Sequence, residues 1–187
     1  MNIDGRWEGV YVHAKGPKAY HPFTIGGDQY AISAELRVQG GRVTGTMTDE
    51  ERVFEVTLPQ MMERDRDTMS PNTAHGYAEF SAAHPEALLT IEYPAQSDLS
   101  GRLEGDRLTF VKEYRGTLQQ TFNLGRDKRT QPVQTVSMST VHYSGVVINE
   151  ALIEGTWVIR KTGPLGRWLP PTDSGQFRLR RNPVPDL

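Results

Sequence analysis

Cysteine, strong net charge and long apolar runs are all absent from this chain of 187 residues. Without cysteine there is no disulfide, no thiolate zinc site and no cysteine nucleophile. The net charge of -2 creates no field of one sign, so we expect neither nucleic acid nor a membrane as a partner. The apolar runs, such as "SGVVI", are also too short to span a bilayer.

The start of the chain lacks the pattern of a signal peptide, since Asp4 and Glu8 stand where an apolar segment is needed. We therefore expect a cytoplasmic protein. A hydrophobic fraction of 36% is adequate for a packed core, and no linker divides the chain. The expected organisation is one domain over residues 1–187.

Short segments rich in Val, Ile, Thr, Tyr and Phe alternate apolar with polar residues, and Gly and Pro punctuate them. This pattern is typical of an antiparallel all-β domain in which neighbouring strands pair as a meander. The expected strands are 6–14, 30–39, 42–49, 52–58, 75–82, 87–93, 97–104, 106–115, 117–124, 139–148, 151–161 and 175–181.

Glycine pairs and polar residues predict where the chain turns. "VQGGRV" (38–43) and "LEGDRL" (103–108) suit two-residue hairpin turns. "TDEERV" (48–53) and "VINEAL" (147–152) are also polar turns between apolar runs, and "EYRGTLQQ" is expected to bend at Arg115-Gly116.

Three longer segments interrupt the strands, at 14–29, 59–72 and 125–138. The second could hold one helical turn, and the third is polar and contains proline. Loops of this length are often binding loops or lids, and we expect the first two to lie at the mouth of the domain.

Alternation also predicts which residues share the apolar face of each strand. These sets are Trp7, Gly9, Tyr11 and His13; Phe54, Val56 and Leu58; Leu108, Phe110, Lys112 and Tyr114; Gly155, Trp157 and Ile159; and Phe177, Leu179 and Arg181. So many strands leave long open edges unless the sheet closes. We therefore predict a single up-and-down barrel of roughly 8–10 strands, with a two-sheet sandwich as the alternative.

The phrase "GRWEGVY" at the first strand resembles the Gly-x-Trp signature of lipocalins, and is similar to the same region of fatty-acid-binding and avidin-like proteins. The resemblance implies a calycin-type barrel whose Trp packs across the bottom and whose top holds a small ligand. "LSGRLEGDRLTFVKEYRG", "YSGVV", "IEGTW" and "GQFRLRR" resemble uncharacterised bacterial barrel proteins. The lipocalin disulfides are missing, and Arg178, Arg180 and Arg181 are only loose substitutes for the usual Arg-bearing motif of the last strand.

Two tryptophans and one lysine stand out on the inward faces. Trp7 and Trp157 both end an Ile-acidic-Gly-x-Trp phrase, and we interpret them as structural plugs that lie near each other at one barrel end. Lys112 breaks an apolar face, so it must pair with an inward carboxylate, reach a barrel mouth, or meet an anionic ligand. Edge positions and β-bulges are structural alternatives. No inward acid is evident, because Glu35, Glu55, Glu92 and Glu113 fall on polar faces.

The five histidines, His13, His21, His75, His84 and His142, show no metal-binding spacing, so no metal site is predicted. "GRWEGVY" also resembles the Gly-x-Trp-x-Gly-x-Gly phrase of nitrobindin-like haem barrels, with Tyr11 in place of the last Gly. Those proteins bind iron through a histidine near the C-terminus, and this chain has none after His142. We therefore expect no cofactor, with haem as a weaker alternative.

No nucleophile elbow and no phosphate-binding glycine loop occur in the sequence. The leading hypothesis is therefore a module that binds a small, partly apolar or anionic ligand inside the barrel. The ligand-binding residues would be Tyr11, His13, Phe110, Lys112, Tyr114 and Tyr143. The alternatives are a hydrolase or isomerase that uses Lys112 or His13, and a structural protein that assembles as a homo-oligomer.

Overall fold

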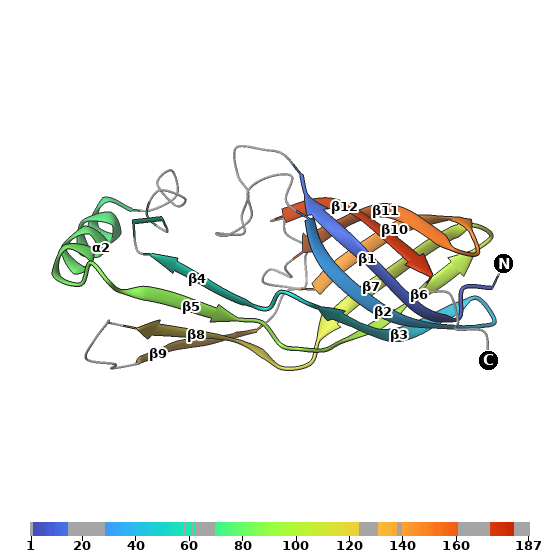
Figure 1. Ribbon diagram of the computed structural model, residues 1–187, viewed down its shortest axis with the longest axis horizontal. Coiled ribbons are helices and arrows are strands. Elements are labelled where there is room, and N and C mark those ends of the chain that lie inside the picture. The colour runs from blue at the N-terminus through green and yellow to red at the C-terminus, as the bar shows by residue number, and fades with distance from the viewer. Residues whose placement is uncertain are drawn as a thin grey trace, which may run out of the picture.

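The protein combines a closed barrel with a long extension that is built around an open sheet (Figure 1). The computed structural model describes residues 2–14, 29–57, 59–60, 62, 70–123, 131–137, 140–160 and 173–181. The barrel strands are β1 (Gly5–His13), β2 (Gln29–Gln39), β3 (Arg42–Asp49), β6 (Ser97–Glu104), β7 (Arg107–Tyr114), β10 (Thr140–Asn149), β11 (Leu152–Arg160) and β12 (Asp173–Arg181). All eight pair antiparallel, and the pairing of β1 with β12 closes the barrel. The prediction of an antiparallel barrel is confirmed.

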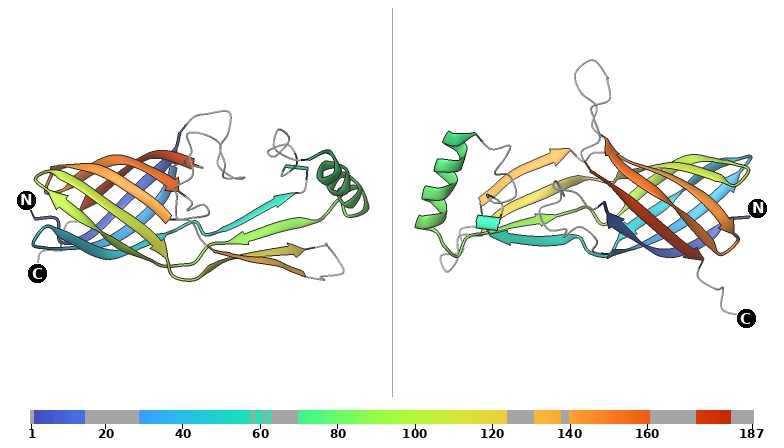
Figure 2. Two further views of the ribbon diagram at one scale, coloured as in Figure 1. Left: turned by 180° about the vertical axis from the view of Figure 1, so that it is seen from behind. Right: turned by 90° about the horizontal axis from the view of Figure 1, so that it is seen from above.

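A second, four-stranded sheet extends from one end of the barrel, and we call it, together with its helix, the arm (Figure 1). Its strands are β4 (Val53–Thr57), β5 (Leu88–Glu92), β8 (Thr117–Asn123) and β9 (Gln131–Ser137). Helix α2 (Pro71–Ala83) lies at the tip of the arm, far from the barrel in every view (Figure 2). That residues 1–187 form one domain stays a prediction.

The arm is built from barrel strands that continue past the barrel end. The arm order β4-β5-β8-β9 repeats the barrel order β3-β6-β7-β10, because each arm strand adjoins its barrel partner in the chain. Short breaks separate the two halves at residues 50–52, 93–96 and 115–116. Each arm strand and the barrel strand that adjoins it can be counted as one long strand. Strands that are consecutive in the chain then pair with each other all the way round the barrel, which confirms the predicted meander.

Alternation along the strands predicted the barrel interior correctly. Trp7, Phe110, Lys112, Trp157, Phe177 and Leu179 are all buried, as are His13, Tyr143 and Leu108. Tyr11, Tyr114 and Ile159 pack against the same core. The side chains of Phe54 and Val56, and all of Leu58, lie outside the described residues.

Glycine makes room for a large ring inside the wall. A Cβ atom on Gly155 would lie 2.2 Å from the Ser144 carbonyl oxygen and 2.7 Å from the Phe177 ring. The predicted hairpin turn at Gly40-Gly41 is also present, with φ angles of 58° and 78° that only glycine adopts easily.

The end of the barrel opposite the arm is sealed by Trp7 and Arg181. Trp7 is fully buried, and its indole N–H donates to the carbonyl of Ile3 at 2.9 Å. The Arg181 guanidinium lies 5.9 Å from the centre of the Trp7 ring and donates to the carbonyl oxygens of Asn2 and Asp4. The arginine that the sequence offered only as a loose substitute therefore covers the first-strand tryptophan.

The expectation that Trp7 and Trp157 lie close together is wrong. Gly175 of β12 pairs with Trp157 on one side and with His13 on the other, so Trp157 is level with His13. His13 is six residues further along β1 than Trp7. Six residues of strand span about 20 Å, so the two indoles occupy opposite ends. The separation of the two indoles is compatible with a closed barrel. In a barrel each strand is staggered against the next, so two residues at corresponding places in β1 and β11 do not lie at the same height.

Three local predictions are also corrected. Residues 75–82 are part of helix α2 and not a strand, because Tyr77 and Phe80 are three residues apart and pack together over Ala87, Leu89 and Ile91. Within the segment 125–138, predicted as a loop, residues 131–137 form β9, which gains its hydrogen bonds from β8. "TDEERV" is a break in one long strand rather than a hairpin turn.

The segment 14–29 lies outside the described residues apart from Ala14 and Gln29, and most of 59–69 does as well.

Candidate functional site

The centre of the candidate site is a buried ion pair between Lys112 and Asp49. The Lys112 Nζ atom lies 2.6 and 2.5 Å from the two carboxylate oxygens of Asp49, and it donates a further bond to the Tyr114 hydroxyl at 3.0 Å. The Tyr114 hydroxyl donates to Asp49 at 2.8 Å. Lys112 is 1% exposed and Asp49 6%. All three ammonium hydrogens thus have acceptors, which is the condition under which a buried charge is tolerated.

Asp49 belongs to the candidate site, although the sequence did not predict it there. It is the last residue of β3, and it shares the inward face with Val43 and Met47. Alternation alone would have placed it inside, but the acidic run that follows it indicated a solvated turn. The choice among an inward carboxylate, a barrel mouth and an anionic ligand is settled by this pairing: Lys112 meets a carboxylate.

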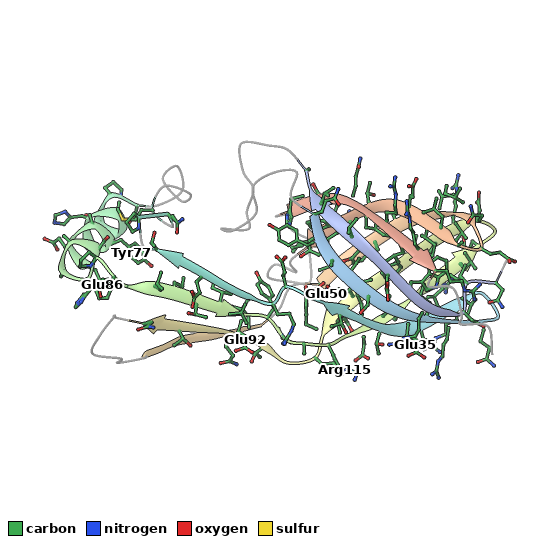
Figure 3. All side chains as sticks on the ribbon, viewed as in Figure 1. Glu35, Glu50, Tyr77, Glu86, Glu92 and Arg115 are labelled. Atoms are coloured by element: carbon green, nitrogen blue, oxygen red, sulfur yellow. The ribbon has the colours of Figure 1, made fainter. Side chains whose placement is uncertain are left out.

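The ion pair lies where the barrel strands pass into the arm. Asp49 precedes the break at 50–52, and Tyr114 precedes the break at 115–116. Ser97, the first residue of β6 after its own break, is fully buried and donates to the Met47 carbonyl at 2.7 Å. Outside the barrel, Arg115 forms a two-bond ion pair with Asp98, and Figure 3 shows Arg115 at the same junction. Polar contacts therefore tie three strands together at the junction.

Burial controls the protonation of this network. Desolvation lowers the pKa of Lys112 from its ordinary value, against the opposing effect of Asp49. Desolvation first, and the Asp49 charge second, raise the pKa of Tyr114 well above its ordinary value. At neutral pH the hydroxyl therefore keeps its proton, and the charges of the ion pair cancel within the network.

Aromatic rings surround the arm end of the barrel. The rings of Tyr11 and Tyr30 stack at 5.3 Å, and His13 meets Trp157 edge to face at 4.8 Å. Tyr11 also contacts Trp157 at 5.7 Å. Desolvation first, and then the Asp49 charge, raise the pKa of Tyr11, so this ring group lies within electrostatic reach of the ion pair.

The remaining two predicted ligand residues belong to the packed interior. Phe110 and Tyr143 stack almost parallel, with centroids 4.6 Å apart and planes at 8°, and Phe177 meets Tyr143 edge to face at 5.1 Å. Tyr143 is 5% exposed, and burial raises its pKa well above the ordinary value. The structure thus brings Tyr11, His13, Lys112 and Tyr114 to the arm end, and places Phe110 and Tyr143 in the stack beneath them.

The histidines do not gather. His13 lies at the arm end, His142 lies on the outer wall of the barrel, and His75 contacts Glu79 on α2. His21 is outside the described residues. Within the described ranges, no group of three His, Asp or Glu side chains is placed to hold a metal ion. The described part of the chain also contains no helix that is long and apolar enough to cross a membrane.

Comparison of the chain with protein-family models, with curated proteins and with solved structures gives no match. A closed eight-stranded barrel is compatible with ligand binding, since barrels of this size have interiors that hold side chains or one small ligand.

Proposed function

We propose that the barrel binds a small, uncharged and partly apolar ligand at its arm end, against the rings of Tyr11, Tyr30 and Trp157. The observation that carries the proposal is the ring cluster beside a buried polar network at one end of a closed barrel. Aromatic walls with a few convergent polar groups are typical of small-molecule sites. Tyr30 and Trp157 are buried, whereas Tyr11 and Tyr114 are only partly buried, so the two latter rings would present the open part of the wall.

The ion pair argues for an uncharged ligand. Because Asp49 already neutralises Lys112, an anion would meet no net positive charge there and would lose its hydration. An uncharged ligand could still donate a hydrogen bond to the Tyr114 hydroxyl, because that oxygen gives its single proton to Asp49, accepts one bond from Lys112 and has a second lone pair.

Two matched probes test the proposal. We expect 2-naphthalenemethanol to change the tryptophan fluorescence of the protein at concentrations where 2-naphthoate, an anion of the same size, does not. The change should be lost in Trp157→Phe and kept in Trp7→Phe, because Trp7 lies at the far end. In Asp49→Asn, which leaves Lys112 charged, the preference should move toward the anion. Equal signals from the two tryptophan variants would contradict the proposal.

The natural ligand can be sought directly. Native mass spectrometry of the protein purified from its own cells should show a retained small molecule with no charge at neutral pH. A retained carboxylate or phosphate that is released by Trp157→Phe would contradict the uncharged class.

A second candidate is acid–base catalysis, which is favoured by three titratable groups within hydrogen-bond reach. It ranks lower because the Lys112 ammonium is 1% exposed and all its hydrogens are bonded. Labelling with trinitrobenzenesulfonate at pH 8 separates the two: a binding scaffold leaves Lys112 unmodified, whereas a catalytic amine open to substrate reacts.

A further inference from the structure

A groove of about 540 Å³ lies on the outer wall of the barrel, over β6, β7, β10 and β11. It is separate from the barrel interior, since the outward side chains around it alternate along the strands with inward ones such as those of Phe110 and Tyr143. The outward residues around it are Ser100, Arg102, Thr109, Val111, His142, Ser144, Thr156, Val158 and Arg160.

Hydroxyl groups form the floor of the groove. Arg102 lies opposite Thr109, Thr109 opposite Ser144, and Ser144 opposite Thr156, so one rung of the sheet carries three neighbouring hydroxyls beside a guanidinium. In an antiparallel sheet such neighbours are about 5 Å apart. The row can therefore make several hydrogen bonds to one hydroxyl-bearing ligand.

Positive charge stands at one end of this floor, at Arg102, and further along β11 beyond its other end, at Arg160. Arg102 and Arg160 line the groove, and in the described part of the chain neither takes part in an ion pair, whereas Arg115 and Arg178 do. No carboxylate is among the described residues that line it. Arg42 lies directly opposite Arg102, a like-charge neighbour that destabilises a sheet unless an anion offsets it.

The pKa of His142 depends on the charge around Arg160. Burial first, and then the positive charge of Arg160, lower its pKa from the ordinary value. Its ring also contacts the Thr140 hydroxyl at 3.3 Å. The acidic residue on the outer face of β7 is Glu113, two residues beyond Val111 and outside the lining. An anion bound at Arg160 would raise the pKa of His142.

The spacing of the arginines selects an elongated ligand. Arg102 and Arg160 are three strand spacings apart across the sheet, about 14 Å, and Arg160 is four residues further along than Thr156, about 13 Å. The two components combine to about 19 Å between the Cα atoms of the arginines. One phosphate cannot engage both guanidinium groups over that span, but two phosphates joined by a chain can, because the two long arginine side chains cover part of it.

We propose that this groove binds a small phosphorylated polyol of the sugar bisphosphate class. One phosphate pairs with Arg102 beside Arg42, the other with Arg160 and His142, and the polyol hydroxyls bond to Thr109, Ser144 and Thr156. Guanidinium groups suit phosphate because they donate two parallel hydrogen bonds. The inference is independent of the arm-end site, which faces the interior.

Fructose 1,6-bisphosphate is the probe. We expect saturable binding by calorimetry and an upward shift of the His142 pKa in an NMR titration, with the signal assigned from His142→Gln. Arg102→Gln and Arg160→Gln should each weaken binding about tenfold, the loss expected for one charged hydrogen-bonding partner. Inorganic phosphate should bind at least about tenfold more weakly than the bisphosphate.

Two further variants serve as controls. Arg180→Gln removes a guanidinium from the outer face of β12, away from the groove, and should leave binding unchanged. Glu113→Gln removes the nearby negative charge and should strengthen binding. The proposal is overturned if the His142 pKa does not move, if inorganic phosphate binds as tightly as the bisphosphate, or if Arg180→Gln weakens binding as much as the groove variants.

Discussion

The Lys112 ammonium contacts both carboxylate oxygens of Asp49, at 2.6 and 2.5 Å, although the two residues are 63 positions apart in the chain. The pair joins β3 and β7 across β6, at the level where these strands leave the barrel for the arm. The interior of the barrel and the root of the arm are therefore held by the same polar contacts.

Breaking this pair on one side should destabilise the protein strongly. We expect Lys112→Met and Asp49→Leu each to lower the free energy of unfolding by about 3 to 5 kcal/mol, because each leaves the other charge buried without its partner. The double variant should be more stable than either single variant. Urea unfolding of all four proteins measures the coupling, and additive losses would show that the pair does not couple as the distances indicate.

Alkaline pH should destabilise the protein through its buried phenols. Burial raises the pKa values of Tyr11, Tyr114 and Tyr143 above the ordinary value of 10.0, so the folded state keeps protons that the unfolded state loses above that pH. Stability is therefore fully present below pH 10 and falls as the pH rises above it, by about 1.4 kcal/mol per pH unit for each group.

Lys112 has the opposite effect on the pH dependence of stability. Because its pKa in the folded state is lowered, the unfolded state binds its proton more tightly, and stability rises with pH until the ordinary value of 10.5 is reached. Above pH 10.5 the lysine contributes no further change. Urea unfolding between pH 10.5 and 11.5 isolates the phenols. Tyr143→Phe should make the pH dependence shallower by one group's share, and an unchanged slope would count against a buried, protonated Tyr143.

Loss of the seal opposite the arm should also be costly. Arg181→Gln removes the guanidinium over Trp7 and its bonds to the carbonyl oxygens of Asn2 and Asp4, so we expect a loss of about 2 kcal/mol in unfolding free energy. The adjacent Arg180 points to solvent, and Arg180→Gln is the matched control, expected within about 0.5 kcal/mol of the wild type. Equal losses in the two variants would mean that the Trp7 contact contributes nothing specific.

Helix α2 should tolerate and benefit from alanine at Gly76. Apart from its chain neighbours and the backbone of α2 itself, no atom of the described residues lies within 4 Å of a Cβ added there. Alanine is favoured over glycine in a helix by about 1 kcal/mol. Hydrogen exchange should slow in α2 and in β5, whose Leu89 and Ile91 belong to the hydrophobic cluster that Tyr77 and Phe80 of α2 pack against, while barrel amides stay unchanged. Slower exchange throughout the barrel would show instead that arm and barrel unfold as one unit.

Much of the barrel could be predicted because its pattern is local. A side chain on a strand points to the face opposite its neighbours, so alternation placed Trp7, Phe110, Lys112 and Trp157 inside without any knowledge of pairing. The Gly40-Gly41 turn was equally evident, since its left-handed backbone requires a residue without a Cβ. Local patterns were therefore sufficient to predict the strand faces, the tight turns and the closure of the sheet.

Features that depend on contacts between distant segments could not be predicted from local patterns. The partner of Lys112 had to come from another strand, and the acidic residues beside Asp49 masked its inward position. Likewise, β9 is held by β8, and α2 by the arm sheet, which local propensity does not encode. The ends at which Trp7 and Trp157 lie follow from the stagger of the closed barrel, a property that accumulates over all eight strands and that no single strand carries.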